Sequence, residues 1–317
     1  TKAAACSKRV GEVFAMEPSV TEHPTGVDLV KSEDKVVFHN VTFTYKGAKE
    51  PALKDISFTA KAGQTIGIIG GTGSGKSTLV NLIPRFYDAS SGEVLVDQVN
   101  VKGYSFHQLR DRIGIVPQKA VLFNGTIADN LRWGKEDATK EEMERAVEIA
   151  QAADVIASKK DGLEEMILQG GKNLSGGQRQ RLTIARALVK EPEILILDDS
   201  ASALDFATDA NLRKAIREKT KGMTVFIVSQ RASTIKQADQ IIVLEDGGMA
   251  GIGTHEELME KCEVYREIVR SQDDRQSEGN QSGTVKGLPE EKKGIQENEN
   301  VKTEKKNGRK GGRKNGR

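Results

Sequence analysis

The sequence is poor in cysteine and has no long apolar run, and both shortages exclude classes of protein. Its 317 residues include two cysteines, Cys6 and Cys262, which lie near opposite ends without metal-binding spacing. We interpret them as reduced thiols of a cytosolic protein. No segment approaches the roughly 18 apolar residues that a membrane-spanning helix needs. No signal peptide is recognisable, and because the chain does not begin with Met we expect a piece of a longer protein.

Charge is nearly balanced over the whole chain but is unevenly distributed along it. The net charge is +2, yet residues 286–317 carry eleven Lys and Arg against five Glu, which leaves a mildly acidic body. A basic tail could touch anionic lipid or nucleic acid. Its composition favours a solvated tail instead, so we do not expect the protein to bind nucleic acid.

Composition divides the chain into four segments. Residues 2–16 follow a helical pattern, and a stretch containing Pro, Thr, Gly and Asp comes after them. We therefore expect a helical segment over residues 1–20, a linker over 21–35 and a globular domain over 36–270. Residues 271–317 are dominated by Gly, Asn, Gln, Glu and Lys. They cannot bury enough apolar surface to offset their chain entropy, which predicts a disordered tail.

Within the globular segment, short apolar runs alternate with helical patterns. The expected strands fall within residues 35–45, 53–63, 64–70, 94–96, 113–116, 194–197, 225–228 and 241–244. The expected helices include residues 140–153, 178–190 and 209–219. Strands and helices in alternation predict an α/β fold with a mostly parallel sheet and helices on its faces.

A glycine-rich loop follows one of these strands and matches the pattern G-x-x-x-x-G-K-[ST]. It has the sequence GGTGSGKST and precedes a helical segment. The glycines let backbone N–H groups surround a phosphate, and the helix directs its positive end toward it. We expect this loop to bind a nucleotide with Mg²⁺ through Gly70, Thr72, Gly73, Ser74, Gly75, Lys76, Ser77 and Thr78. The lysine would reach the β- and γ-phosphates and Ser77 would coordinate Mg²⁺. The alternative is a glycine-rich turn without a ligand.

The strand ILILDD, residues 194–199, ends in two adjacent carboxylates. Asp198 comes first after the apolar run, so we place it at the carboxyl end of the strand as a ligand of Mg²⁺. Asp199 points elsewhere and could face the attacking water. It is therefore the candidate catalytic carboxylate.

Further motifs strongly resemble the ATP-binding cassette (ABC) family. They include NLSGGQRQRLTIARAL, which contains the family signature LSGGQ, and VTFTYKG, IVPQKAVLFNGTI, SALD and IVSQRASTI. The motifs stand in the family's order, and the resemblance covers residues 36–270. It implies a P-loop NTPase core with a mostly parallel sheet, an antiparallel β subdomain and a helical signature subdomain. The most similar members are nucleotide-binding domains of exporters, in which residues 1–20 would be a remnant of the helix leading out of a membrane domain.

The resemblance implies a role for each motif residue. Tyr45 would stack on adenine, and Gln118 would contact Mg²⁺ and the attacking water. Ser202 and Asp205 would join two subunits across a dimer. The signature would bind the γ-phosphate of ATP held by the opposite subunit through Leu174, Ser175, Gly176, Gly177 and Gln178.

Simpler interpretations of the same residues remain open on sequence grounds. Tyr45 is compatible with an aromatic residue in the core of a strand. Gln118 is compatible with an ordinary polar loop residue. Asp205 alone would be interpreted as an N-cap of the helix that follows it.

Three positions depart from the family pattern. Most ABC ATPases have Glu where this chain has Asp199, and His where it has Gln230; many exporters have an acidic residue at the position of Gln169. Asp is shorter than Glu by one C–C bond, about 1.5 Å, and a misplacement of about 1 Å can cost on the order of 100-fold in rate. Gln can hydrogen-bond a γ-phosphate but carries no charge and shuttles no proton. We therefore expect a site that binds ATP and hydrolyses it slowly.

An intact signature beside such a site resembles one half of a heterodimeric bacterial multidrug-type exporter. The partner would be a non-identical ABC subunit with Glu and His at the catalytic positions. The chain would also work with a membrane domain, its own or the partner's, at the cytoplasmic face of the cell membrane. One alternative is a nucleotide-binding regulatory module. The other is a soluble ABC ATPase, although such proteins usually carry two cassettes or long coiled coils.

Overall fold

The computed structural model describes residues 2–22, 26–28 and 30–281. The chain divides into two units, residues 1–276 and 277–317. The first residues form the predicted helix, α1 (Lys2–Phe14), and none of its side chains is buried. No helix in the described ranges has the length and apolar character needed to cross a bilayer.

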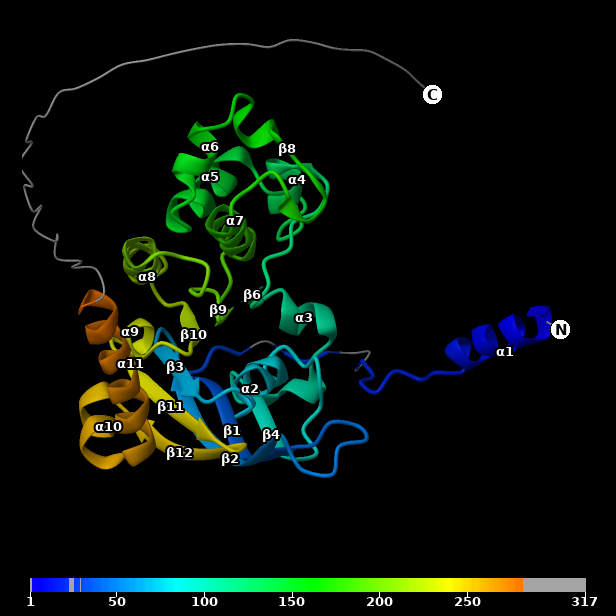
Figure 1. Ribbon diagram of the computed structural model, residues 1–317. Helices are drawn as coiled ribbons and strands as arrows, with labels where there is room; N and C mark the ends of the chain where they lie inside the picture. Colours follow the sequence, from blue (N-terminus) through cyan, green and yellow to red (C-terminus); the bar gives the residue numbers. More distant parts are fainter. Residues whose placement is uncertain (1, 23–25, 29, 282–317) are drawn as a thin grey trace, which may run out of the picture. The chain divides into compact units, whose positions relative to one another are not determined.

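A six-stranded sheet occupies the centre of the first unit (Figure 1). Its strand order is β12-β11-β3-β10-β9-β6, and every neighbouring pair is parallel except β11 with β12. In chain order these strands are β3 (Thr65–Gly70), β6 (Ile113–Val116), β9 (Ile194–Asp198), β10 (Thr224–Val228), β11 (Gln240–Glu245) and β12 (Gly248–Gly253). The mostly parallel sheet predicted from the apolar runs is confirmed.

Both faces of the parallel part of this sheet are buried, because successive side chains of its strands belong to two different cores. Leu195 and Leu197 of β9 join the core under the helices, whereas Ile194 and Ile196 join the core under the second sheet. Burial on both faces explains why these strands are continuous apolar runs rather than alternating patterns.

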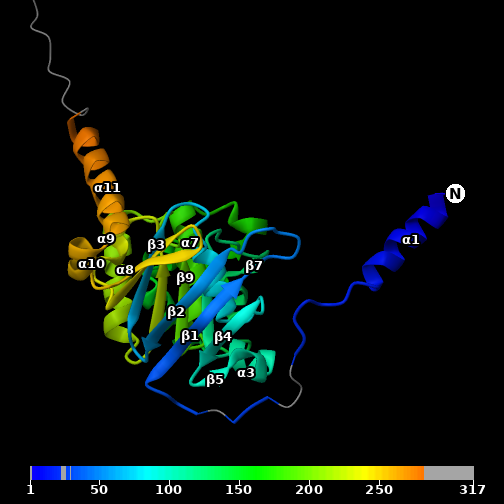
Figure 2. The same cartoon turned by 90° about the horizontal axis from the view of Figure 1, so that it is seen from below.

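The second sheet is antiparallel and has the order β2-β1-β4-β5 (Figure 2). Its strands are β1 (Asp34–Phe43), β2 (Leu53–Lys61), β4 (Ser91–Val96) and β5 (Val99–Asn100). Phe38 and Phe58 stack across β1 and β2 with ring centroids 4.7 Å apart. This sheet is the predicted antiparallel subdomain.

The predicted helical signature subdomain is inserted between β6 and β9. It consists of four helices and a short two-stranded antiparallel sheet. In chain order these elements are β7 (Gly125–Thr126), α4 (Ile127–Arg132), α5 (Lys140–Ile149), α6 (Ala153–Ala157), β8 (Met166–Ile167) and α7 (Gly176–Leu188). The remaining helices are α2 (Lys76–Leu82), α3 (Phe106–Arg110), α8 (Phe206–Lys219), α9 (Ala232–Ile235), α10 (His255–Lys261) and α11 (Glu263–Gln281).

The last helix extends beyond the boundary expected from composition. Residues 271–281, assigned to the tail on sequence grounds, form the end of α11. A helix that is already nucleated adds residues at little cost, even where the sequence is polar. The remainder of the expected tail, residues 282–317, lies outside the described residues.

A buried group of charged side chains joins the two sheets at the amino-terminal edge of the parallel one. Asp97, only 1% exposed, accepts hydrogen bonds from Lys35 and Arg112, and both cations also bind Glu193. Burial by itself would raise the pKa of Glu193, but its hydrogen bonds from Arg112 and Lys35 lower it to about 2. Each charge in the group is therefore paired.

We expect Asp97→Ala to lower the free energy of unfolding by about 3–5 kcal/mol, because it leaves two buried cations with one carboxylate. Urea denaturation followed by circular dichroism measures the change. Glu144→Ala is the control, since its pair with Lys140 is exposed and 3.7 Å long, and its removal should leave stability nearly unchanged. Equal effects of the two substitutions would contradict the structural role of the buried group.

Candidate nucleotide-binding site

Four neighbouring strands deliver the predicted site residues to one edge of the sheet. The phosphate loop follows β3, Asp198 ends β9 and Asp199 follows it directly. Gln118 and Gln230 lie two residues beyond β6 and β10. These strands are adjacent and parallel in the order β3-β10-β9-β6, so their carboxyl ends lie side by side. In open α/β sheets this edge is where ligands bind.

The phosphate loop depends on glycines for its shape. Gly73 and Gly75 have φ values of 83° and 98°, in the left-handed region. A Cβ on Gly75 would also lie 2.7 Å from the carbonyl oxygen of Ala52. Ser74 is 5% exposed, and its Oγ lacks a hydrogen-bond partner within the described part of the chain. A phosphate oxygen is the kind of acceptor such a buried hydroxyl requires.

Lys76 is folded into this loop. Its Nζ donates to the carbonyl oxygens of Gly70 at 2.9 Å and Gly71 at 2.6 Å. Burial lowers the pKa of Lys76, and the neighbouring carboxylates of Asp199 and Asp198 partly oppose that effect. The ammonium group is thus held at the phosphate loop by neutral acceptors, which phosphate oxygens could replace.

Ser77 and Asp198 form an oxygen-rich pair beside the loop. The Ser77 hydroxyl donates to Asp198 Oδ1 at 2.9 Å. Burial raises the pKa of Asp198, the bond from Ser77 opposes the rise, and Asp199 adds to it. A hydroxyl and a carboxylate are the hard oxygen ligands that Mg²⁺ prefers, and a cation there would stabilise the ionised carboxylate. The residues present therefore fit Mg²⁺ bound together with a nucleotide.

Asp199 occupies a tight turn directly after Asp198. Its φ is 46°, and its backbone N–H donates to the carbonyl oxygen of Val228 at 3.0 Å. Its carboxylate accepts a hydrogen bond of 3.1 Å from Gln118 Nε2. The structure thus brings Gln118 to Asp199, whereas the resemblance directed it toward Mg²⁺.

Tyr45 lies beside the start of α2. Its hydroxyl is 3.0 Å from Thr78 Oγ1, and its ring makes edge contacts with Phe43 and Tyr87. The side chain lies beyond the end of β1 and is 38% exposed. The alternative of a core strand aromatic is therefore excluded, and stacking on adenine stays a prediction.

The signature residues form the start of α7. Ser175 is the N-cap and makes a capping box with Gln178, while Leu174 is buried and Ser175 and Gly176 are exposed. A Cβ placed on Gly177 would lie 3.4 Å from the carbonyl oxygen of Ala203. The signature helix therefore begins against the SALD loop, and no hydrogen bond among the described residues joins it to the phosphate loop of its own chain.

The SALD loop is itself hydrogen-bonded. Ser202 Oγ donates to the carbonyl oxygen of Asp199 at 2.9 Å. Asp205 is the N-cap of α8 and accepts from the backbone N–H of Thr208 at 2.9 Å, a contact that lowers the pKa of its carboxyl group. The N-cap interpretation is confirmed, and a role in a dimer stays a prediction.

Gln230 is exposed, and its backbone is held by a residue that sequence reasoning missed. Gln272 of α11 contacts the main chain of Gln230 and Ala232. No local pattern could have identified Gln272, because it lies in the segment assigned to the tail and its partners are about forty residues away.

Comparison with known proteins agrees with this geometry. Residues 53–202 match the family described as ABC transporter. An uncharacterised ABC transporter ATP-binding protein of Mycobacterium tuberculosis is 45% identical over 280 residues, covering 86% of this chain and 47% of the relative. A β-(1→2)glucan export ATP-binding/permease protein of Bradyrhizobium diazoefficiens is 45% identical over 255 residues, covering 80% of this chain and 42% of the relative.

A solved structure of a bacterial Atm1-family ABC exporter with ATP bound is also similar. It superimposes with a TM-score of 0.79 at 35% identity, covering 84% of this chain and 47% of that one. The chain thus spans about half the length of the relatives it matches. The α/β core described above is an ABC ATPase fold, and the chain carries a nucleotide-binding domain of the ABC transporter family.

Proposed function

We propose that the chain binds Mg-ATP and powers transmembrane export as one half of an ABC transporter dimer. The names of the glucan export relative and of the exporter structure support transport in the export direction. Because the chain spans about half of those proteins, the membrane domain would belong to the remaining part or to a partner. The domain would then work at the cytoplasmic face of the membrane, with residues 1–20 leading from the membrane domain and 21–35 as the linker.

In the proposed site, the phosphate loop holds the phosphates and Tyr45 stacks on the adenine. Ser77, Asp198 and Gln118 would hold Mg²⁺, which when bound with ATP neutralises charge on the phosphate oxygens. Lys76 would exchange the carbonyl oxygens of Gly70 and Gly71 for phosphate oxygens. Asp199 would orient water.

Slow hydrolysis at this site is the specific part of the proposal, and it rests on Asp199 standing together with Gln230. The shorter carboxylate reaches about 1.5 Å less far than Glu, and Gln118 already engages it. Gln230 can donate a hydrogen bond to the γ-phosphate but supplies neither positive charge nor a titratable proton. Both deficits act on the transition state more than on bound ATP, so binding is preserved while turnover falls.

The intact signature has a different task, which is to complete the ATP site of the opposite subunit. Leu174 to Gln178 keep the family sequence, and the exposed start of α7 presents backbone N–H groups that suit a phosphate. A partner with Glu and His at the catalytic positions would hydrolyse ATP at that second site. We therefore propose a heterodimeric exporter of the bacterial multidrug type.

Lys76→Met should raise the Kd for Mg-ATP by about 10- to 100-fold, because one charge-assisted contact to phosphate is lost. Isothermal titration of the full 317-residue chain measures it. Lys160→Met, at an exposed lysine of the helical subdomain, should leave the Kd unchanged. Unaltered affinity in the Lys76 variant would place the nucleotide elsewhere.

Asp199→Glu combined with Gln230→His should speed ATP hydrolysis by tenfold or more without tightening ATP binding. Phosphate release and retention of bound ATP are measured for the original and the changed chain. Adding Lys76→Met must abolish the gain. Slow hydrolysis is refuted if the original chain already hydrolyses a few ATP per second and the two substitutions do not change that rate. The chain would then be a self-sufficient ATPase.

The signature's action on the opposite subunit can be tested by mixing variants. In the Asp199→Glu, Gln230→His background, Ser175→Arg and Lys76→Met should each abolish turnover. An equal mixture of the two variants should recover about one quarter of the turnover. Random pairing makes half of the dimers mixed, and each mixed dimer has one intact composite site out of two. Light scattering confirms that dimers form, and dimers without recovered activity would contradict a shared site.

A further inference from the structure

The loop that carries Gln230 is stabilised partly from within. Ser229, 2% exposed, accepts a hydrogen bond of 2.9 Å from the backbone N–H of Arg231, and its hydroxyl donates to the carbonyl oxygen of the same residue at 3.2 Å. These contacts leave the carbonyl of Gln230 and the N–H of Ala232 to be satisfied by another part of the chain.

One side chain of α11 satisfies both groups. Gln272 Nε2 donates to the carbonyl oxygen of Gln230 at 2.7 Å, and Gln272 Oε1 accepts from the N–H of Ala232 at 2.9 Å. Ala232 begins α9, whose N-cap, Arg231, provides no side-chain capping bond. The amide of Gln272 therefore acts as the missing cap and fixes the peptide plane that follows Gln230.

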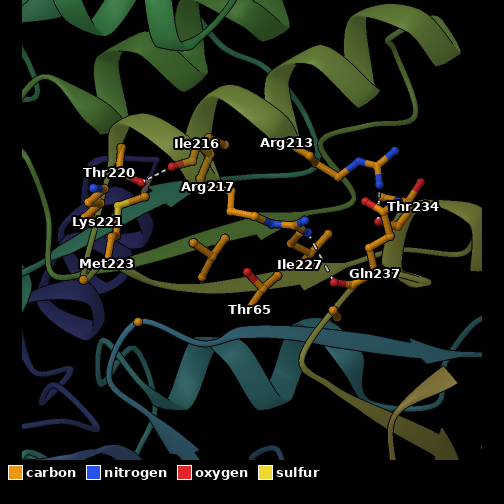
Figure 3. A pocket seen from close by; sticks show the side chains of 14 residues that line it. Thr65, Arg213, Ile216, Arg217, Thr220, Lys221, Met223, Ile227, Thr234 and Gln237 are labelled. Carbon is orange, nitrogen blue, oxygen red and sulfur yellow. Dashed lines mark hydrogen bonds between the residues drawn. The ribbon is translucent and has the colours of Figure 1, made fainter. Parts of the chain in front are cut away.

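The other end of this segment is fixed by α8 (Figure 3). Arg213 donates to the carbonyl oxygen of Thr234 at 3.0 Å, and Arg217 donates to that of Gln237 at 3.3 Å, beside a cavity of about 70 Å³. The Arg231 guanidinium also lies over the Phe206 ring at 5.3 Å. With α8 holding its far end, the peptide between Gln230 and Arg231 is held by two contacts, from the Arg231 N–H to Ser229 and from Gln272 to the Gln230 carbonyl.

We propose that Gln272 is a positioning residue for Gln230, through which α11 sets how well the site distinguishes ATP from ADP. The proposal rests on the function proposed above, in which Gln230 contacts the γ-phosphate. Rotation of the peptide after Gln230 would redirect the residue and its side chain away from the phosphate edge. The hydrogen bond that Gln272 donates to the carbonyl oxygen of Gln230 opposes that rotation, and the bond that Gln272 accepts from Ala232 holds the Gln272 amide in place.

The test compares the Kd values of Mg-ATP and Mg-ADP for the full 317-residue chain. Gln272→Ala should reduce the preference for ATP over ADP by about fivefold, the effect of one hydrogen bond. Gln272→Glu should do the same, because a carboxylate can accept from Ala232 but cannot donate to the carbonyl of Gln230. Ser271→Ala is the matched control, because the hydrogen bond of the Ser271 hydroxyl found in the described part of the chain stays within α11, and it should change nothing.

A double-mutant cycle with Gln230→Ala separates the possible outcomes. The proposal predicts that Gln272→Ala has no further effect on the preference once the Gln230 side chain is removed. If Gln230→Ala reduces the preference but Gln272→Ala weakens both nucleotides equally or neither, the positioning role is overturned and the proposed function stands. If Gln230→Ala itself leaves the preference unchanged, Gln230 does not contact the γ-phosphate. The positioning role of Gln272 and the proposed contact of Gln230 are then both overturned.

Discussion

Burial of both faces of the parallel sheet is the constraint on which the rest of the structure depends. A strand shifted by one residue would exchange the side chains of its two cores, so the register is fixed. Val228 of β10 is paired with Ile68 of β3 on one side and with Asp198 of β9 on the other. This register brings the phosphate loop, the two adjacent aspartates and the loop of Gln230 to the same level at the carboxyl-terminal edge of the sheet.

The two ends of the sheet differ in how their polar groups are satisfied. At the amino-terminal edge, Asp97 and Glu193 are paired with cations, and the pKa of Glu193 falls to about 2 because hydrogen bonds from Arg112 and Lys35 outweigh the effect of burial. At the carboxyl-terminal edge, burial raises the pKa of Asp198 and Ser74 Oγ has no partner among the described residues. Complete pairing indicates a structural role, whereas incomplete pairing indicates a place for a ligand.

Much of this arrangement could be predicted because its signals are local. The phosphate loop has fixed spacing after a strand, and the buried strands are short runs of apolar residues. The contact from Gln272 to the Gln230 loop could not be predicted. The segment that contains Gln272 has no apolar pattern, and the contact forms only when α11 packs beside α9. Sequence reasoning also missed the buried charged group of Lys35, Asp97, Arg112 and Glu193. Charged residues on four separate segments form no spacing pattern that a sequence could reveal.

At position 199, the shape of the turn favours a short side chain, whereas reach toward a water molecule favours a longer one. At a φ of 46° a short side chain that bonds locally is tolerated better than a longer one, and an ordinary L residue in this region costs about 1–2 kcal/mol. Aspartate therefore suits the turn but extends less far toward water than glutamate would. The same turn continues through Ser202, which bonds back to the carbonyl of Asp199, to Ala203, which adjoins Gly177 of the signature. A single short segment thus connects the carboxylate proposed to slow hydrolysis at the chain's own site with the helix start proposed to serve a partner.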